Sequence, residues 1–76
     1  MSYRDLEVNE FYTYFDIVLM YVGEHPNLQI KVIFKVILMP DNHIVRTLSS
    51  YNKDNKTLQM LKNGLMMSSV YKLESK

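Results

Sequence analysis

The sequence has no cysteine and no tryptophan, and it has only two glycines and two prolines. Disulfides and zinc–thiolate sites are therefore excluded. A glycine-rich phosphate-binding loop is also excluded, because Gly23 and Gly64 stand far apart. The two histidines, His25 and His43, lie in separate turns and do not supply the three or more ligands that a metal site needs. We expect no metal and no cofactor.

Long apolar runs are absent as well. The longest, residues 11–22, contains Asp16 and is shorter than the ~18 residues of a membrane-spanning helix. The first seven residues lack the basic and then apolar layout of a signal peptide. We therefore expect a cytoplasmic protein with no membrane partner.

A chain of 76 residues predicts one globular domain over residues 1–76. The apolar fraction of 47% is that of a folded protein, but a chain this short buries only about 60% of its unfolded surface. Good packing or self-association must supply the stability, and a homodimer is one expected form. Alanine is absent, which is the bias of an A/T-rich genome such as that of many phages.

The net charge of +1 favours no class of partner, but the charges are unevenly distributed. Residues 1–24 hold five acidic side chains and one basic one, whereas residues 25–76 hold three acidic and eight basic ones. Such asymmetry indicates either a basic face or two halves that neutralise each other in the fold. The second interpretation is favoured.

The clearest element is a long central strand from Leu28 to Met39. Every second residue from Leu28 onward is apolar, which is the pattern of a strand facing a core. The other side begins with Lys31 and Lys35 and ends with apolar residues. We expect that side to be half-exposed near the lysines and covered near Ile37.

Turn residues and spacing predict the elements that follow: a turn at Pro40–His43, a returning strand at Ile44–Ser50, a short helix at Lys56–Asn63 and a last strand at Ser69–Leu73. The helix rests on Leu58 and Leu61 at helical spacing and on Gly64 where a helix C-cap glycine belongs.

The segment Phe11–Val22 fits two structures. Its apolar residues match helical spacing, but nearly all are aromatic or β-branched, which favours a strand bent near Phe15 and Asp16. As a strand it would place Tyr12 and Tyr14 on one face and Phe11, Phe15, Ile17 and Leu19 on the other. Glu24–Asn27 would then connect it to the central strand as a second hairpin.

Together these elements predict a mainly β fold with one short helix. The expected architecture is a small antiparallel meander or a small open barrel of the SH3-like kind, with the helix before the last strand. The alternative is an α+β fold in which an N-terminal helix packs on a β-hairpin.

Catalytic residues are not apparent. The serines, in Ser49-Ser50 and Ser68-Ser69, have no nucleophile motif around them, so we interpret them as strand-ending residues that bond the backbone. Asp16 interrupts an apolar run and could be a buried, pKa-shifted carboxylate, but a residue at a bend is the favoured interpretation. We expect a protein that is not an enzyme.

Two sets of residues could instead bind a partner. Met39, Met60, Met66 and Met67 either close the core, which is the favoured interpretation, or form an apolar patch that meets a partner, because Met fills irregular gaps and is frequent on adaptable binding surfaces. The favoured function is therefore a non-enzymatic protein-interaction module, a regulator or inhibitor of a larger protein of the kind found in phages and mobile elements. Its contact residues would be Ile37, Met39, Leu65, Met66 and Met67. The alternative function is nucleic-acid binding, by rings that stack on bases beside lysines that contact phosphates. Its contact residues would be Tyr12, Tyr14, Lys31 and Lys35.

Overall fold

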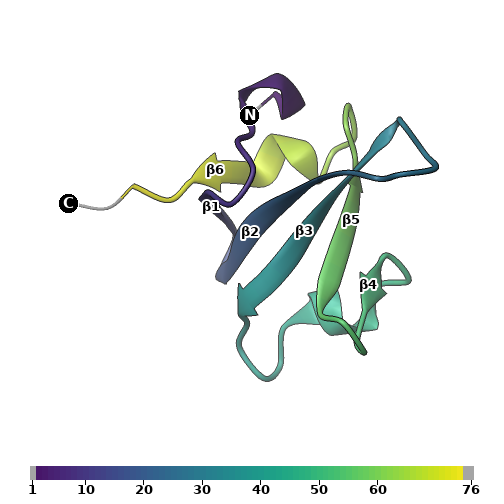
Figure 1. Ribbon diagram of the computed structural model, residues 1–76. Helices are drawn as coiled ribbons and strands as arrows, with labels where there is room; N and C mark the ends of the chain where they lie inside the picture. The colour runs from purple at the N-terminus through teal and green to yellow at the C-terminus, as the bar shows by residue number, and fades with distance from the viewer. Residues whose placement is uncertain (1, 75–76) are drawn as a thin grey trace.

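The computed structural model describes residues 2–74, and these residues form one antiparallel sheet in the order β4-β5-β3-β2-β1-β6 (Figure 1). The strands are β1 (Phe11–Tyr14), β2 (Ile17–Glu24), β3 (Lys31–Leu38), β4 (Tyr51–Asn52), β5 (Thr57–Leu61) and β6 (Val70–Lys72). Three 3-10 turns accompany them: η1 (Tyr3–Asp5), η2 (Ile44–Thr47) and η3 (Met67–Ser69). The predicted mainly β fold is confirmed, and the α+β alternative is wrong because residues 2–74 contain no α-helix.

The ambiguous N-terminal segment forms two strands rather than a helix. β1 and β2 pair from Phe11 opposite Met20 to Tyr14 opposite Ile17, and a two-residue turn joins them. The bend expected near Phe15 and Asp16 is this turn. Phe15 has a φ of 53°, in the left-handed region that glycine normally occupies in such hairpins.

The predicted central strand is confirmed at its centre and wrong at both ends. β3 begins only at Lys31, because His25 accepts the N–H groups of Asn27 and Leu28 and holds the preceding residues in a turn. Ile37 was expected to be covered, but it is 48% exposed. The register between β2 and β3 shifts there, which leaves Ile37 without a partner across the ladder.

The predicted strand at Ile44–Ser50 is wrong. Ile44–Thr47 is the turn η2, and Nδ1 of His43 accepts the Val45 N–H at its start. Arg46 donates to the carbonyls of Met39 and Pro40, which fixes η2 against the end of β3. Val45 is buried by this arrangement. The alternation over this segment is weak, and η2 needs only one inward side chain.

The predicted helix at Lys56–Asn63 is also wrong, because Thr57–Leu61 is strand β5. β5 pairs with β3 over five residues and supplies ladder hydrogen bonds that β3 would otherwise lack on that side. Leu58 and Met60 point into the core while Thr57 and Gln59 are half-buried, which is a strand period. The spacing of Leu58 and Leu61 fits a helix only by coincidence.

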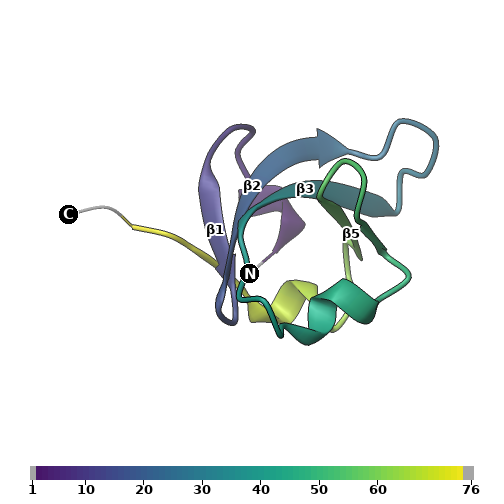
Figure 2. The same cartoon turned by 90° about the horizontal axis from the view of Figure 1, so that it is seen from below.

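The last strand closes the fold by returning to the first. β6 pairs with β1, which confirms the predicted final strand within Ser69–Leu73. The only helical turn directly before it is the short η3. In the view of Figure 2, η2 and η3 lie on the open side of the curved sheet. Their inward residues Val45 and Met67 belong to the same buried cluster as the sheet residues, which are Tyr12, Ile17, Leu19, Tyr21, Val32, Phe34, Val36, Leu58, Met60 and Val70.

Acidic side chains of the first third of the sequence pair with basic side chains of the remainder in the fold. Lys62 lies 2.9 Å from the carboxylate of Glu24, and Lys72 lies 3.8 Å from that of Glu7. Both pairs join the acidic first third of the chain to the basic remainder. The expectation that the halves neutralise each other is supported at these two positions.

Candidate functional site

The residues expected to contact nucleic acid do not share a surface. Tyr12 is fully buried, its ring is edge-to-face with Phe34, and its hydroxyl oxygen accepts the Glu7 N–H at 2.8 Å. Tyr14 is half-buried and packs on the core. Lys31 and Lys35 belong to the opposite face of the sheet. The structure therefore corrects the sequence interpretation: Tyr12 and Tyr14 do not form a stacking platform beside Lys31 and Lys35.

The residues expected to contact a protein are split between the core and two ends of the molecule. Met67 is 2% exposed and is a core residue. Leu65 is 91% exposed and, with Met66, lines a mostly apolar groove of about 340 Å³ near the start of β3. Ile37 and Met39 line a different cleft at the other end of β3. These two ends are about 20 Å apart, because a strand rises ~3.3 Å per residue.

A further apolar surface lies on the outer side of the sheet. Cross-strand partners point to the same side, and the pairs Phe11–Met20, Thr13–Val18, Thr13–Tyr71 and Val18–Leu38 place these residues opposite those of the core. Leu73 continues the row, since its N–H donates to the Phe11 carbonyl. We call this surface the outer apolar face, and its members are Phe11, Val18, Met20, Leu38, Tyr71 and Leu73.

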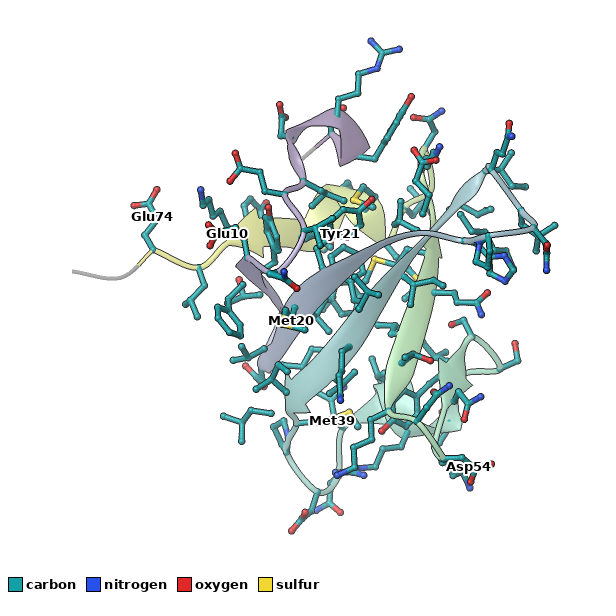
Figure 3. All side chains as sticks on the ribbon, in the orientation of Figure 1. Glu10, Met20, Tyr21, Met39, Asp54 and Glu74 are labelled. Atoms are coloured by element: carbon teal, nitrogen blue, oxygen red, sulfur yellow. The ribbon has the colours of Figure 1, made fainter. Side chains whose placement is uncertain are left out.

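The outer apolar face is accessible along most of its length. Leu38 and Tyr71 are 65% and 63% exposed, and Phe11 and Leu73 are also exposed. Met20, labelled on β2 in Figure 3, is half-buried between its neighbours. The polar residues in the same rows are Thr13 and Lys35, so charge on this face is sparse. The outer apolar face thus joins four neighbouring strands, from β6 to β3.

Sequence reasoning missed this face because the β1–β2 turn changes which alternate residues point toward the core. In one continuous strand, Phe11 and Leu19 would point the same way. The two-residue turn instead pairs Tyr12 with Leu19, so even-numbered residues of β1 and odd-numbered residues of β2 face the core. Phe11 is thereby turned outward and Tyr12 inward. The Phe15–Asp16 bend was the signal from which the exchange could have been read.

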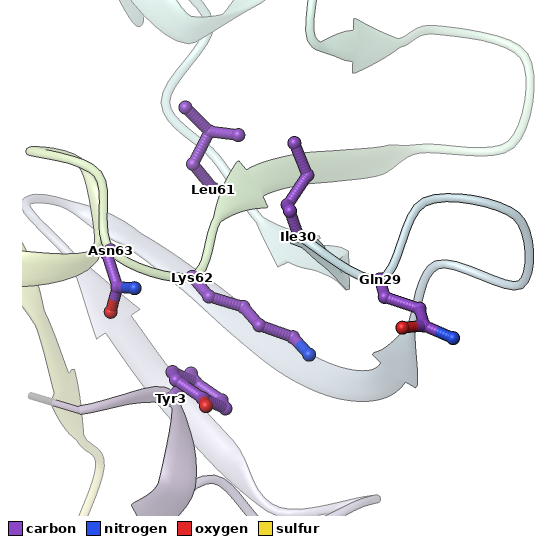
Figure 4. Close-up of a pocket in the computed structure, with 6 residues that line it drawn as sticks. All are labelled: Tyr3, Gln29, Ile30, Leu61, Lys62 and Asn63. Atoms are coloured by element: carbon purple, nitrogen blue, oxygen red, sulfur yellow. The ribbon is translucent and has the colours of Figure 1, made fainter.

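A cleft of about 530 Å³ with mixed polar and apolar lining lies where η1 meets the start of β3 and the end of β5 (Figure 4). Its lining residues are Tyr3, Gln29, Ile30, Leu61, Lys62 and Asn63. The Lys62 ammonium lies 4.9 Å from the centre of the Tyr3 ring as well as 2.9 Å from Glu24. Lys62 is therefore already occupied, and it ties the N-terminal segment to the sheet.

The charges around this cleft shift two titrating groups. A hydrogen bond from Arg4, and then the charges of Arg4 and Lys62, lower the pKa of Tyr3. The same contact with Tyr3 raises the pKa of Arg4. On the inner side of the sheet, burial raises the pKa of Tyr21, and the nearby Glu24 carboxylate adds to the rise.

Other polar candidates have local structural roles. Asp16 is exposed at the β1–β2 turn, which fits the bend interpretation and not a buried carboxylate. The Ser68 hydroxyl donates to the Leu65 carbonyl, as expected for a serine that bonds nearby backbone. Within residues 2–74, no three His, Cys, Asp or Glu side chains are grouped as metal ligands, and no helix is both long and apolar enough to cross a membrane.

Known proteins offer no relative to guide the assignment. No family model, no curated protein and no solved structure matches the chain. Any assignment of function therefore rests on the surfaces described above.

Proposed function

We propose that the chain is a non-enzymatic protein-interaction module that uses the outer apolar face to bind the apolar surface of a larger protein, which it regulates or adapts. The observation that carries the proposal is the continuity of exposed and half-buried apolar side chains from β6 through β1 and β2 to Leu38 of β3. Contiguous exposed apolar surface on a small domain is typical of interaction sites.

The composition of the face supports a protein partner. Two of its exposed members, Phe11 and Tyr71, are aromatic, and aromatic residues are enriched at the centres of protein interfaces. The lone charged neighbour in its rows, Lys35, leaves the face largely free of charges that would have to lose water on binding. The strands beneath it are held by ladder hydrogen bonds, so little ordering accompanies binding.

The test compares capture of a partner by three tagged forms of the chain. The wild type, the double variant Tyr71→Ser/Leu73→Ser and the single variant Leu65→Ser are each incubated with lysate of the native cells, and retained proteins are identified by mass spectrometry. Leu65 is a matched control, because it is 91% exposed and apolar but lies off the outer apolar face. We expect the wild type and Leu65→Ser to retain the same protein and the double variant to lose it.

The proposal fails if the double variant retains that protein as well as the wild type does. Loss with Leu65→Ser instead would assign binding to the groove beside Met66. Light scattering on the purified chain tests whether a second copy of the chain binds to the outer apolar face instead. A mass of two chains that reverts to one chain in the double variant would make the partner another molecule of this protein.

A further inference from the structure

A basic cleft lies at the end of the molecule where β3 finishes. It has a volume of about 450 Å³ and is lined by Arg46, Thr47, Tyr51, Lys53 and Lys56. Three of these five residues are cations and none is acidic. A second, smaller cleft of about 230 Å³ beside Leu38 shares the lining residues Arg46, Tyr51 and Lys56 with it.

The cations of the basic cleft are mostly available. Across residues 2–74, no carboxylate lies within ion-pair distance of Lys53 or Lys56. Arg46 has only a loose pair with the fully exposed Asp41, at 3.9 Å. Its guanidinium is instead aimed by the carbonyls of Met39 and Pro40, which accept from it at 3.4 Å. A cation positioned by neutral carbonyls keeps its full charge for a ligand.

Lys56 is present despite an unfavourable backbone conformation. Its φ is 57°, in the left-handed region where glycine and asparagine are the usual residues. The conformation is held by β3, since the Val36 N–H donates to the Lys56 carbonyl at 2.7 Å. Asn52 and Asn55 secure the rest of the turn by accepting backbone N–H groups. Lys56 therefore lines the basic cleft from a turn that these hydrogen bonds hold in place.

We propose that the basic cleft binds the phosphates of a single-stranded nucleic acid, with Lys53, Lys56 and Arg46 contacting phosphates and the accessible part of the half-buried Tyr51 ring contacting a base. Cationic grooves that contain an aromatic side chain are how small β-folds hold single strands. None of the residues that line the basic cleft belongs to the outer apolar face, and none is among the four that the sequence suggested for nucleic acid.

The test is fluorescence anisotropy with a labelled oligothymidylate of about 20 nucleotides, longer than the ~4–16 nucleotides that such sites cover. Each cation on a single strand contributes about 0.7 to the slope of log affinity against log salt, so three contacts predict a slope near −2. The affinity of the wild type should then fall about 18-fold between roughly 50 and 200 mM salt. For Lys56→Gly the same change of salt should cost only about sevenfold.

Two further variants separate this site from general attraction to charge. Lys53→Gln should behave like Lys56→Gly. Lys31→Gln removes the same charge at a site about 15 Å or more from the basic cleft, measured along β3. This variant should keep the wild-type slope. A circular-dichroism melt confirms that each variant is folded, and glycine is favoured at the left-handed position 56.

Absence of binding at about 50 mM salt would overturn the proposal. So would an equal loss in Lys31→Gln and Lys56→Gly, or binding to phosphatidylserine vesicles with none to the oligonucleotide. The double variant Tyr71→Ser/Leu73→Ser should bind the oligonucleotide as the wild type does. Failure of the protein-interaction proposal and failure of this one are therefore distinguishable.

Discussion

The sheet from β6 through β1 and β2 to β3 carries apolar residues on both sides, yet only one side is covered. The inner side packs Leu19, Phe34 and their neighbours against η2 and η3 and leaves them inaccessible to water. The outer side presents Leu38 and Tyr71 at more than half of their full exposure. The difference is one of partners within the chain, because the described residues supply a second layer for the inner side alone. Apolar content by itself does not distinguish a core from a binding surface.

A matched pair of leucine substitutions gives the largest expected contrast between the sides. Leu19→Ala removes a fully buried side chain and should lower the free energy of unfolding by about 2–5 kcal/mol. Leu38→Ala makes the same deletion on the outer apolar face and should change it by no more than about 0.5 kcal/mol. Urea unfolding followed by circular dichroism measures both. Similar losses for the two would mean that the outer apolar face is structural.

A smaller change in the free energy of unfolding is expected at Tyr12, which faces the core although the sequence pattern grouped it with surface residues. Tyr12→Phe keeps the ring against Phe34 but removes the oxygen that accepts the Glu7 N–H. The free energy of unfolding should fall by about 1 kcal/mol. Tyr71→Phe is the control on the outer side and should have no measurable effect in the same urea titration. A Tyr12→Phe variant as stable as the wild type would contradict the hydrogen bond.

The smallest effect is a dependence on alkaline pH that belongs to the inner side. The pKa of Tyr21 is raised from 10.0 by burial, so the folded protein holds the phenol proton more tightly than the unfolded chain does. The resulting stabilisation is fully present below pH 10 and is lost as the pH rises through the folded pKa. Urea midpoints measured from pH 8 to 11 should fall less steeply for Tyr21→Phe than for the wild type. Parallel curves would show that Tyr21 does not contribute.

Predictions from the sequence held where one strong pattern had no competitor. The alternation around Val32, Phe34 and Val36 defined the centre of β3, because apolar residues at every second position have only one way to face a core. Two other segments were misassigned. Thr57–Leu61 is compatible with either a helix or a strand. It forms a strand because it pairs with the backbone N–H and C=O groups on one edge of β3. Ile44–Thr47 has no strong pattern, and its structure follows from the His43 cap and the carbonyls that Arg46 binds.

For the candidate surfaces too, the sequence did not show which residues packing would bury or bring together. Leu65 was grouped with Met66 and Met67 as one apolar stretch that would close the core or form a patch, but it is 91% exposed whereas Met67 is 2% exposed. Met67, two residues later, was not distinguished from it, since burial of a methionine depends on the direction in which η3 turns. The basic cleft was not predicted at all. Arg46 and Lys56 come from separate segments and meet only because η2 and the β4–β5 turn pack at the same end of β3.

The sequence alone determined a small, mainly β chain without cysteine chemistry, with a β-branched central strand and turns at residues 15–16 and 40–43. Period-2 alternation and turn residues are local properties and act before any tertiary contact forms. The tertiary structure decided which side of each strand became core. A two-residue turn reverses that choice for every residue of β1, and the reversal is felt only when β1 lies against β2. The outer apolar face and the basic cleft both exist because of such packing decisions.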